Sequence, residues 1–296
     1  MSRLFDNYVM VDWSAAAKPS LGVDSIWIGI LRRDVRLQLR FEAQNPPTRH
    51  GALETISTLL TEFDKRGDRT LIGFDFPMGY PHGTAAALKL EGPAWQAMHL
   101  FLSKEIKDKT NNANNRFQVA ARMNRLISNG PFPFWGCPPR DVLTTLDSKK
   151  TRPHEASDLP EHRLTEQLVK AASPVWKLFT AGSVGSQALV GIPIVQKLRD
   201  LREDARIWPF ETGFKPLIRE DLKDVRIVMA EIYPSMLKTQ GKAGEVKDLA
   251  QVRAIGAHFA GLDEAGKLSA CFGPAKSLTA AQITIVEQEE GWILGV

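Results

Sequence analysis

The sequence predicts an α/β fold in which helices flank a mixed β-sheet. Three observations support this: short apolar runs near the start, segments with helical spacing of apolar residues in the middle, and renewed alternation of both kinds in the last third. Of the 296 residues, 43% are hydrophobic and 24% are charged. This composition is typical of a soluble globular protein that buries a large core. We expect a single domain over residues 1–296, with a mostly helical insertion at about 85–205.

The first third contains four predicted strands and one predicted helix. Tyr8–Asp12 (YVMVD) is a short apolar run, as expected of a strand buried on both faces. Ser25–Leu31 is a second strand, and Arg36–Ala43 alternates polar and apolar residues like a strand at a sheet edge. Glycine and charged turns separate these three strands, so antiparallel hairpins are the natural connections. Gly51–Lys65 then has helical spacing, and Thr70–Asp75 (TLIGFD) is another buried strand.

The middle of the chain is predicted to be mostly helical. Ala94–Lys107 and Asn114–Ile127 carry apolar residues at helical spacing. Gly130–Pro139 is too rich in proline for a helix or a strand and is predicted to be an ordered aromatic loop. Asp147–Leu159 is the most polar stretch, and we expect it to be mobile. Gly182–Leu201 is typical of a glycine-rich turn that enters a helix, which a proline either kinks or splits.

The last third returns to alternating strands and helices. Arg206–Phe210 is a candidate for a short strand, and Arg226–Tyr233 (RIVMAEIY) is a stronger one that a proline ends. Val246–Phe259 and Leu278–Gln288 have the apolar spacing of helices. The sequence shows no internal repeat and no low-complexity linker, so one domain with an insertion fits better than two independent domains.

Three predicted strands each carry one carboxylate at or near their end. These acids are Asp12 in VMVDWS, Asp75 in IGFDFP and Glu231 in MAEIYP. A carboxylate in such an apolar setting loses hydration, which is costly unless a charge or hydrogen-bond donors replace the water. If the strands are neighbours, the acids converge at the edge where open α/β sheets place their sites. Ligation by oxygen alone suits Mg²⁺ or Mn²⁺.

Each acid also has a purely structural interpretation. Asp12 is alternatively a strand-end cap that bonds the backbone near Ser14, and Asp75 before Phe-Pro is alternatively a turn-forming residue. Glu231 is harder to explain in this way, because glutamate is a poor strand former. Taken singly these signals are weak, and their combination is what predicts a shared site.

The segments VDWS, FDFPMGYP and EIYPSM resemble the DUF429 family, which comprises predicted nucleases of the ribonuclease H-like superfamily. Further similarity lies in GSVGSQALVGIP (182–193) and in EEGWILGV (289–296). The resemblance implies a mixed five-stranded sheet, with three antiparallel strands followed by two parallel ones and helices on both faces. It also implies two-metal phosphodiester hydrolysis, in which one ion activates water and the other stabilises the leaving oxygen.

By this resemblance Asp12 would bridge two metal ions, with Asp75 and Glu231 as further ligands. The fourth acid that such sites draw from a helix after the last strand would be Asp248, in VKDLAQVR. An aspartate at a helix start is also an ordinary cap or dipole partner. The rival candidates for the fourth acid are Asp263 and the Glu287–Glu290 cluster. The final helix departs from the family pattern because it lacks the expected aspartates.

Several other residues are candidates for contacting a phosphate. The turn at 182–187 precedes a helix and presents backbone amides, although it is neither a Walker loop nor a dinucleotide fingerprint. With the acids nearby, the candidate substrate contacts are Ser14, Ser183, Gly185, Gln187 and Arg122. Arg116, Arg122 and Arg125 lie on one predicted helix, where they either hold phosphates or form a solvated face. The aromatic residues that either stack bases or pack into the core are Phe132, Phe134 and Trp135.

Other chemistries find little support. Cys137 and Cys271 match no ligand spacing, and no Gly-x-Ser-x-Gly elbow occurs. The histidines show neither HxH nor HExxH spacing; they are His50, His82, His99, His154, His162 and His258. The formal charge of +4 permits an anionic partner such as nucleic acid but is small for a chain of this length. The start of the chain is not a secretory signal, and no uncharged apolar run of about 20 residues occurs. We therefore expect a cytoplasmic protein without a membrane partner.

The first functional hypothesis is a hydrolase, dependent on Mg²⁺ or Mn²⁺, that acts on nucleic acid or on a nucleotide-type phosphoester. The alternative is a non-catalytic protein of the same fold that binds a nucleotide, a phosphate or a phosphorylated cofactor. A third possibility, an enzyme of the related sugar-kinase and ATPase branch, ranks lower. The chain lacks the second phosphate motif and the duplicated half of that branch.

Overall fold

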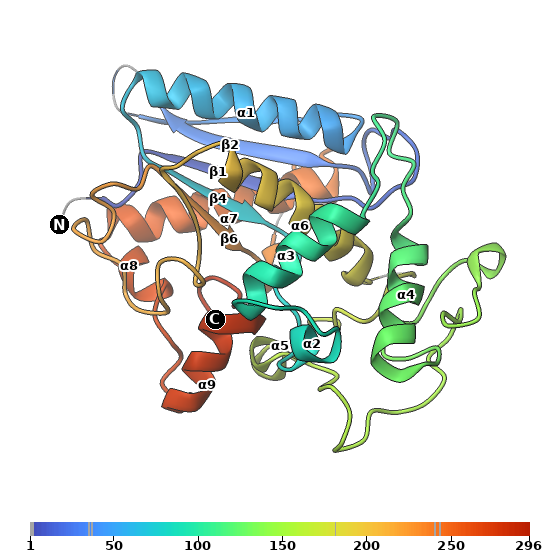
Figure 1. Cartoon of the computed structure of the whole chain (residues 1–296). Helices are drawn as coiled ribbons and strands as arrows, with labels where there is room; N and C mark the ends of the chain where they lie inside the picture. The colour runs from blue at the N-terminus through green and yellow to red at the C-terminus, as the bar shows by residue number, and fades with distance from the viewer. Residues whose placement is uncertain (1–2, 35, 37, 181, 240, 243) are drawn as a thin grey trace.

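A mixed six-stranded sheet forms the centre of the molecule (Figure 1). The computed structural model describes residues 3–34, 36, 38–180, 182–239, 241–242 and 244–296. The order of the strands is β3-β2-β1-β4-β6-β5, where the first three strands are antiparallel and β4, β6 and β5 continue parallel to β1. The strands are β1 (Asn7–Asp12), β2 (Trp27–Arg33), β3 (Leu39–Gln44), β4 (Thr70–Phe74), β5 (Ala205–Ile207) and β6 (Ile227–Glu231).

The expected antiparallel-then-parallel arrangement is confirmed, but the expected number of five strands is wrong. The additional strand is β5, at the parallel edge beside β6. It lies within the region where the sequence offered only a short strand candidate. Ala205 and Ile207 are buried, so even this three-residue strand contributes two side chains to the core.

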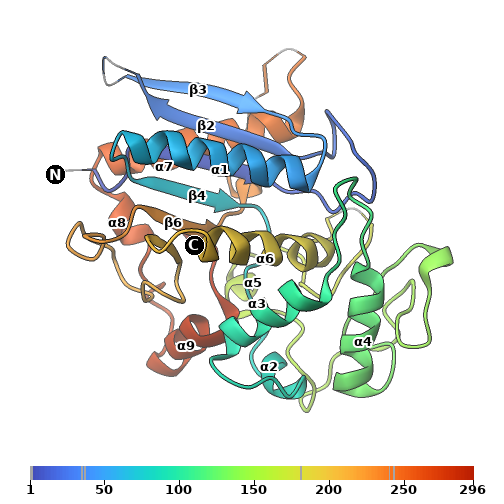
Figure 2. The ribbon, with the colours of Figure 1, turned by 45° about the horizontal axis from the view of Figure 1, so that its top comes forward.

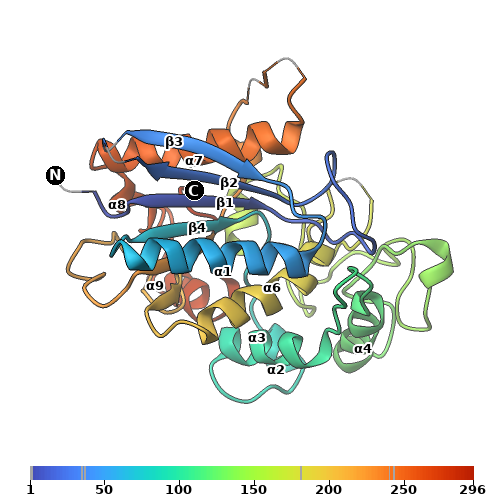
Figure 3. The ribbon, with the colours of Figure 1, turned by 90° about the horizontal axis from the view of Figure 1, so that it is seen from above.

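Helices cover both faces of the sheet (Figures 2 and 3). α1 and α6 lie on one face of the sheet, and α7 lies on the other. Each strand packs with both layers, because its side chains point alternately to the two faces. On β1, Val9 and Val11 pack with α1 and α6, whereas Tyr8 and Met10 pack with α7. The helices are α1 (Arg49–Lys65), α2 (Thr84–Ala87), α3 (Ala94–Glu105), α4 (Arg116–Ser128), α5 (Leu164–Leu168), α6 (Gly185–Asp200), α7 (Lys247–Glu264), α8 (Leu268–Cys271) and α9 (Ala280–Ile285).

α7 packs closely on the sheet because a glycine makes room for it. A Cβ atom on Gly29 of β2 would lie 2.9 Å from a methyl group of Val252, so any larger residue would push the helix away. This packing fixes the position of α7, whose first turn carries Asp248. Among the helices of the described residues, none is both long enough and apolar enough to cross a membrane.

The segment between β4 and β5 holds the helices α2 to α6. The polar stretch at 147–159 contains neither helix nor strand. α6 runs without a break through Pro193. After α9, the chain forms a π-helical turn over Val286–Glu290. This turn packs on the loop that follows β4, and the residues that hold it there are described below.

Candidate functional site

The carboxyl ends of β1, β4 and β6 lie side by side, because these three strands are parallel neighbours. Val11 is in register with Phe74, and Phe74 is in register with Glu231. Asp12 follows Val11 and Asp75 follows Phe74, so each aspartate lies one residue beyond the residues in register with Glu231. The backbone N–H of Asp75 donates to the carbonyl of Val11 at 2.9 Å, which holds the two strand ends together.

The one-residue offset separates Glu231 from the two aspartates. Side chains in register on parallel strands point to the same face, and the next residue points to the opposite face. Val11 and Phe74 pack with the α1 and α6 layer, so Glu231 points to that side. Ile232, in line with Asp12 and Asp75, packs with the α7 layer. The strand pleat therefore directs Asp12 and Asp75 towards α7 and Glu231 away from it.

Asp12, Asp75 and Asp248 form the acidic cluster of this sheet end. All three are half-buried. Burial raises the pKa of Asp12 well above its ordinary value, and the charges of Asp75 and Asp248 raise it further. Burial also raises the pKa of Asp75 to about 7, with contributions from the charges of Glu231 and Asp248. The ammonium group of the exposed Lys247 offsets this repulsion in part.

Asp248 is held in place by the loop that precedes β2. Its Oδ2 accepts a hydrogen bond from the backbone N–H of Asp24 at 2.9 Å. Burial raises the pKa of Asp248. The sequence identified Asp248 only as a candidate for a fourth acid, and the electrostatic coupling to Asp12 and Asp75 shows that the structure brings it to the same sheet end.

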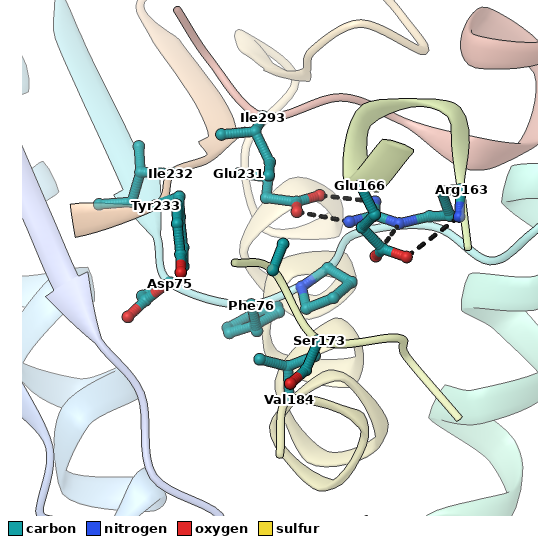
Figure 4. A pocket seen from close by; sticks show the side chains of 12 residues that line it. Asp75, Phe76, Arg163, Glu166, Ser173, Val184, Glu231, Ile232, Tyr233 and Ile293 are labelled. Carbon is teal, nitrogen blue, oxygen red and sulfur yellow. Dashed lines mark hydrogen bonds and ion pairs between the residues drawn. The ribbon is translucent and has the colours of Figure 1, made fainter. Parts of the chain in front are cut away.

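Glu231 is bound by a residue that the sequence did not single out. The guanidinium of Arg163 donates to Oε1 of Glu231 at 2.6 Å and to Oε2 at 2.8 Å. Figure 4 shows the carboxylate of Glu231 directed at Arg163, while the carboxylate of Asp75 points away, on the side of Tyr233. The backbone N–H of Met78 also donates to Oε2 of Glu231 at 3.1 Å. Both side chains of the pair are almost fully buried.

The oxygen donors of the acidic cluster fit a hard divalent cation. Burial and neighbouring negative charge raise the pKa values of these carboxylates, Lys247 offsets the repulsion only in part, and a divalent cation would supply further positive charge. Within the described residues, however, no three His, Cys, Asp or Glu side chains stand together as a ready metal-binding group. This holds for Asp12, Asp75 and Asp248 as well as for Glu231, which faces the other side of the sheet.

Comparisons with protein-family models, with curated proteins and with solved structures found no match to this chain.

The glycine-rich turn before α6 lies next to the end of β1. Nε2 of Gln187 donates to the carbonyl of Trp13, the residue after Asp12, at 2.5 Å. Ser14 donates to the carbonyl of Asp24, in the loop that positions Asp248. The N–H of Gly185 is bonded to the carbonyl of Lys177, so this amide is already used. Ser183 lies in the same turn and is half-buried. Ser14 and Gln187 thus contact the backbone around the acids.

The three arginines of α4 do not act together. Arg122 is exposed and forms an ion pair with Glu105, which corresponds to the solvated face that the sequence left open. Arg125 is exposed as well. Arg116 instead reaches the first turn of α6, where its Nε donates to Oγ of Ser186 at 3.0 Å. Burial and the nearby charge of Arg49 lower the pKa of Arg116 to about 10.

The rival candidates for the fourth acid, Asp263 and the cluster at 287–290, accept hydrogen bonds from backbone N–H groups. Asp263 accepts hydrogen bonds from two N–H groups near the start of the chain and from the hydroxyl of Tyr8. Glu287 accepts from the N–H of Phe214. Glu289 and Glu290, in the π-helical turn, accept from N–H groups at 82–85 and at Leu164. These bonds account for the burial of the acids and tie the end of the chain to the loop after β4.

The aromatic loop contributes mainly to the core. Phe132 and Phe134 are buried, and the ring of Phe134 contacts those of Tyr80 and Trp176. Trp135 is half-buried and packs against the same core. The burial of Phe132 and Phe134 favours the packing interpretation over base stacking.

The raised pKa of Asp75 predicts a pH-dependent loss of stability in metal-free protein. The folded state binds this proton more tightly than the unfolded state, so the contribution is fully present below about pH 4 and is lost as the pH rises to about 7. Allowing for solvent screening, we expect the wild type to lose about 2 kcal/mol relative to Asp75→Asn between pH 5 and pH 8. Urea unfolding of both proteins in chelator measures this difference. Titrating groups that do not interact with Asp75, such as the buried His99, affect both proteins equally. Asp12 does interact with Asp75, so the substitution also lowers the pKa of Asp12. Parallel stability curves would contradict the assignment.

Proposed function

We propose that this protein is a divalent-metal-dependent phosphodiester hydrolase of ribonuclease H-like fold, in which Asp12, Asp75 and Asp248 hold Mg²⁺ or Mn²⁺. The observation that carries the proposal is that three half-buried carboxylates interact electrostatically at this sheet end: Asp12 at the end of β1, Asp75 directly after β4 and Asp248 in the first turn of α7. Burial, and then neighbouring negative charge, raises the pKa values of Asp12 and Asp75. Glu231, which the resemblance implied as a further ligand, is left out because Arg163 binds it.

The sheet supports the fold part of the proposal. Three antiparallel strands lead into parallel strands, helices cover both faces, and the acids follow the first and fourth strands. These are the features that the family resemblance implies. The sixth strand extends the parallel edge beyond β6 and leaves the acid-bearing ends unchanged.

The surrounding residues fit a phosphate-containing substrate. A bound divalent ion would supply Lewis-acid stabilisation of charge on the phosphodiester. Asp75, with a pKa of about 7, is suited to hold a proton that is released when the cation binds. Lys247 is an exposed cation beside the acids, and Ser14 and Gln187 lie at the same strand end. These residues would position the anionic substrate.

The test is hydrolysis of bis(p-nitrophenyl) phosphate, and of generic RNA and DNA, by chelator-treated protein with and without added Mn²⁺ or Mg²⁺. We expect product only with the metal, and loss of activity when chelator is restored. Binding of Mn²⁺ without product from any of these substrates would contradict the hydrolase. Absence of Mn²⁺ binding would contradict the metal site itself.

One observation favours the non-catalytic alternative. The described residues hold no preassembled group of three ligands, and a cation that belongs to the protein already neutralises Glu231. A protein that binds a nucleotide or a phosphorylated cofactor needs only the anion contacts. Calorimetry with nucleotides that gives saturable binding in chelator, and no product with Mn²⁺, would select this alternative.

A further inference from the structure

The ion pair formed by Arg163 and Glu231 is almost fully buried. Arg163 is 1% exposed and Glu231 is 3% exposed. Oε2 of Glu231 accepts from both Arg163 and Met78, and Oε1 accepts from Arg163. A metal ion on the remaining lone pair of Oε1 would lie within a few ångströms of the guanidinium. Two positive charges at that separation, away from water, repel strongly.

We propose that Arg163 is a built-in counter-ion that withdraws Glu231 from the ligand set and limits this sheet end to one divalent cation, held by Asp12, Asp75 and Asp248. The inference rests on the proposed metal site and adds to it the number of ions. A second ion of the kind that the family resemblance implies would need Glu231, and Arg163 already supplies the positive charge there.

Hydrogen bonds to several elements hold the side chain of Arg163 in place, so it does not readily leave Glu231. Its Nε donates to Oε1 of Glu166 at 2.8 Å, and Nη1 also donates to the carbonyl of Glu290 at 2.9 Å. Glu166 in turn accepts from the backbone N–H of Arg163 at 3.0 Å. The helical insertion supplies Arg163 and Glu166, the π-helical turn supplies Glu290, and the sheet supplies Glu231. Displacement of Arg163 would leave two buried carboxylates without a counter-charge.

The space between the two groups of acids is small. A cavity of about 20 Å³ is lined by apolar side chains and by the polar residues Asp75, Arg163, Glu166, Ser173, Glu231 and Tyr233 (Figure 4). Such a volume holds about one water molecule. A cation in this cavity would face the guanidinium, whereas a cation between Asp12, Asp75 and Asp248 lies on the α7 side of the strands. The guanidinium of Arg163 therefore disfavours a cation in this cavity.

The experiment counts Mn²⁺ ions bound to the full chain by electron paramagnetic resonance, with total manganese measured after desalting. Two variants complete it. Arg163→Met with Glu166→Gln uncovers Glu231 and leaves the net charge unchanged. The same pair with Glu231→Met removes the whole ionic group, and methionine keeps the volume largely filled. Circular dichroism confirms that each variant is folded.

We expect one bound Mn²⁺ in the wild type. In the variant that uncovers Glu231, we expect two bound ions with spin coupling. In the triple variant, we expect one bound ion with a Kd within about threefold of the wild type. Two ions in the wild type, one ion in the variant that uncovers Glu231, or loss of the ion in the triple variant would each overturn the inference. No ion in the wild type would instead refute the proposed metal site. If the first variant does not fold, the triple variant still tests whether Glu231 is a ligand.

Discussion

The Asp12→Asn variant is expected to lose metal-dependent phosphodiester hydrolysis by at least about a thousandfold, as is typical when a central group of a catalytic unit is removed. Asp12 interacts electrostatically with both Asp75 and Asp248, the other two members of the cluster. An amide in its place keeps the shape but cannot offset the charge of a divalent cation. Initial rates of bis(p-nitrophenyl) phosphate hydrolysis at saturating Mn²⁺ measure the effect.

Asp24→Asn is the matched control for this variant. It removes the same charge from the same neighbourhood, and Asp24 has a positive φ of 55° that asparagine tolerates well. Asp24 binds Asp248 through its backbone, which the substitution keeps. We expect its rate to stay within about fivefold of the wild type, as is usual for a charge outside the reacting centre. Equal turnover by Asp12→Asn and wild type would exclude Asp12 as a ligand.

The Arg163→Met variant is expected to lose about 3–5 kcal/mol of unfolding free energy in metal-free protein, because it leaves Glu231 buried without its partner. Glu166 loses its partner in the same step. Urea unfolding monitored by tryptophan fluorescence measures the change. Added Mn²⁺ is expected to recover part of the loss, since the uncovered carboxylate then has a cation to bind.

Arg122→Met provides the comparison on the surface. Arg122 pairs with Glu105 but is 54% exposed, so its removal should cost at most about 1 kcal/mol. A loss for Arg163→Met that is no larger than this would show that the buried pair is not the stabilising contact described above.

The position of Asp12 and Asp75 at the sheet edge was predictable from sequence, because each directly follows an apolar run that forms a strand. Asp12 and Asp75 each come directly after the last buried residue of a parallel strand, and parallel neighbours end at the same edge. The class of the fold was predictable for the same reason, since buried strands and amphipathic helices have different apolar spacing.

The orientation of Glu231 was not predictable in this way. Its strand has the same apolar character, but its side chain is one residue out of phase with the two aspartates, and only the register reveals this. Arg163 was harder still, since it lies in a polar stretch without periodicity and its partner is 68 residues away. The edge strand β5 pairs on one side through three residues, too few for a clear pattern.

The order of the strands has a consequence for how the protein folds. β6 pairs with β4 only after the chain has passed through the whole helical insertion, and α7, which carries Asp248, follows β6. Contacts between such distant segments form late and slow folding, because a long loop must close before they are gained. Hairpins β1 to β3 can assemble early from local contacts. The acidic cluster would therefore be completed last, so a partly synthesised chain would carry Asp12 and Asp75 without Asp248.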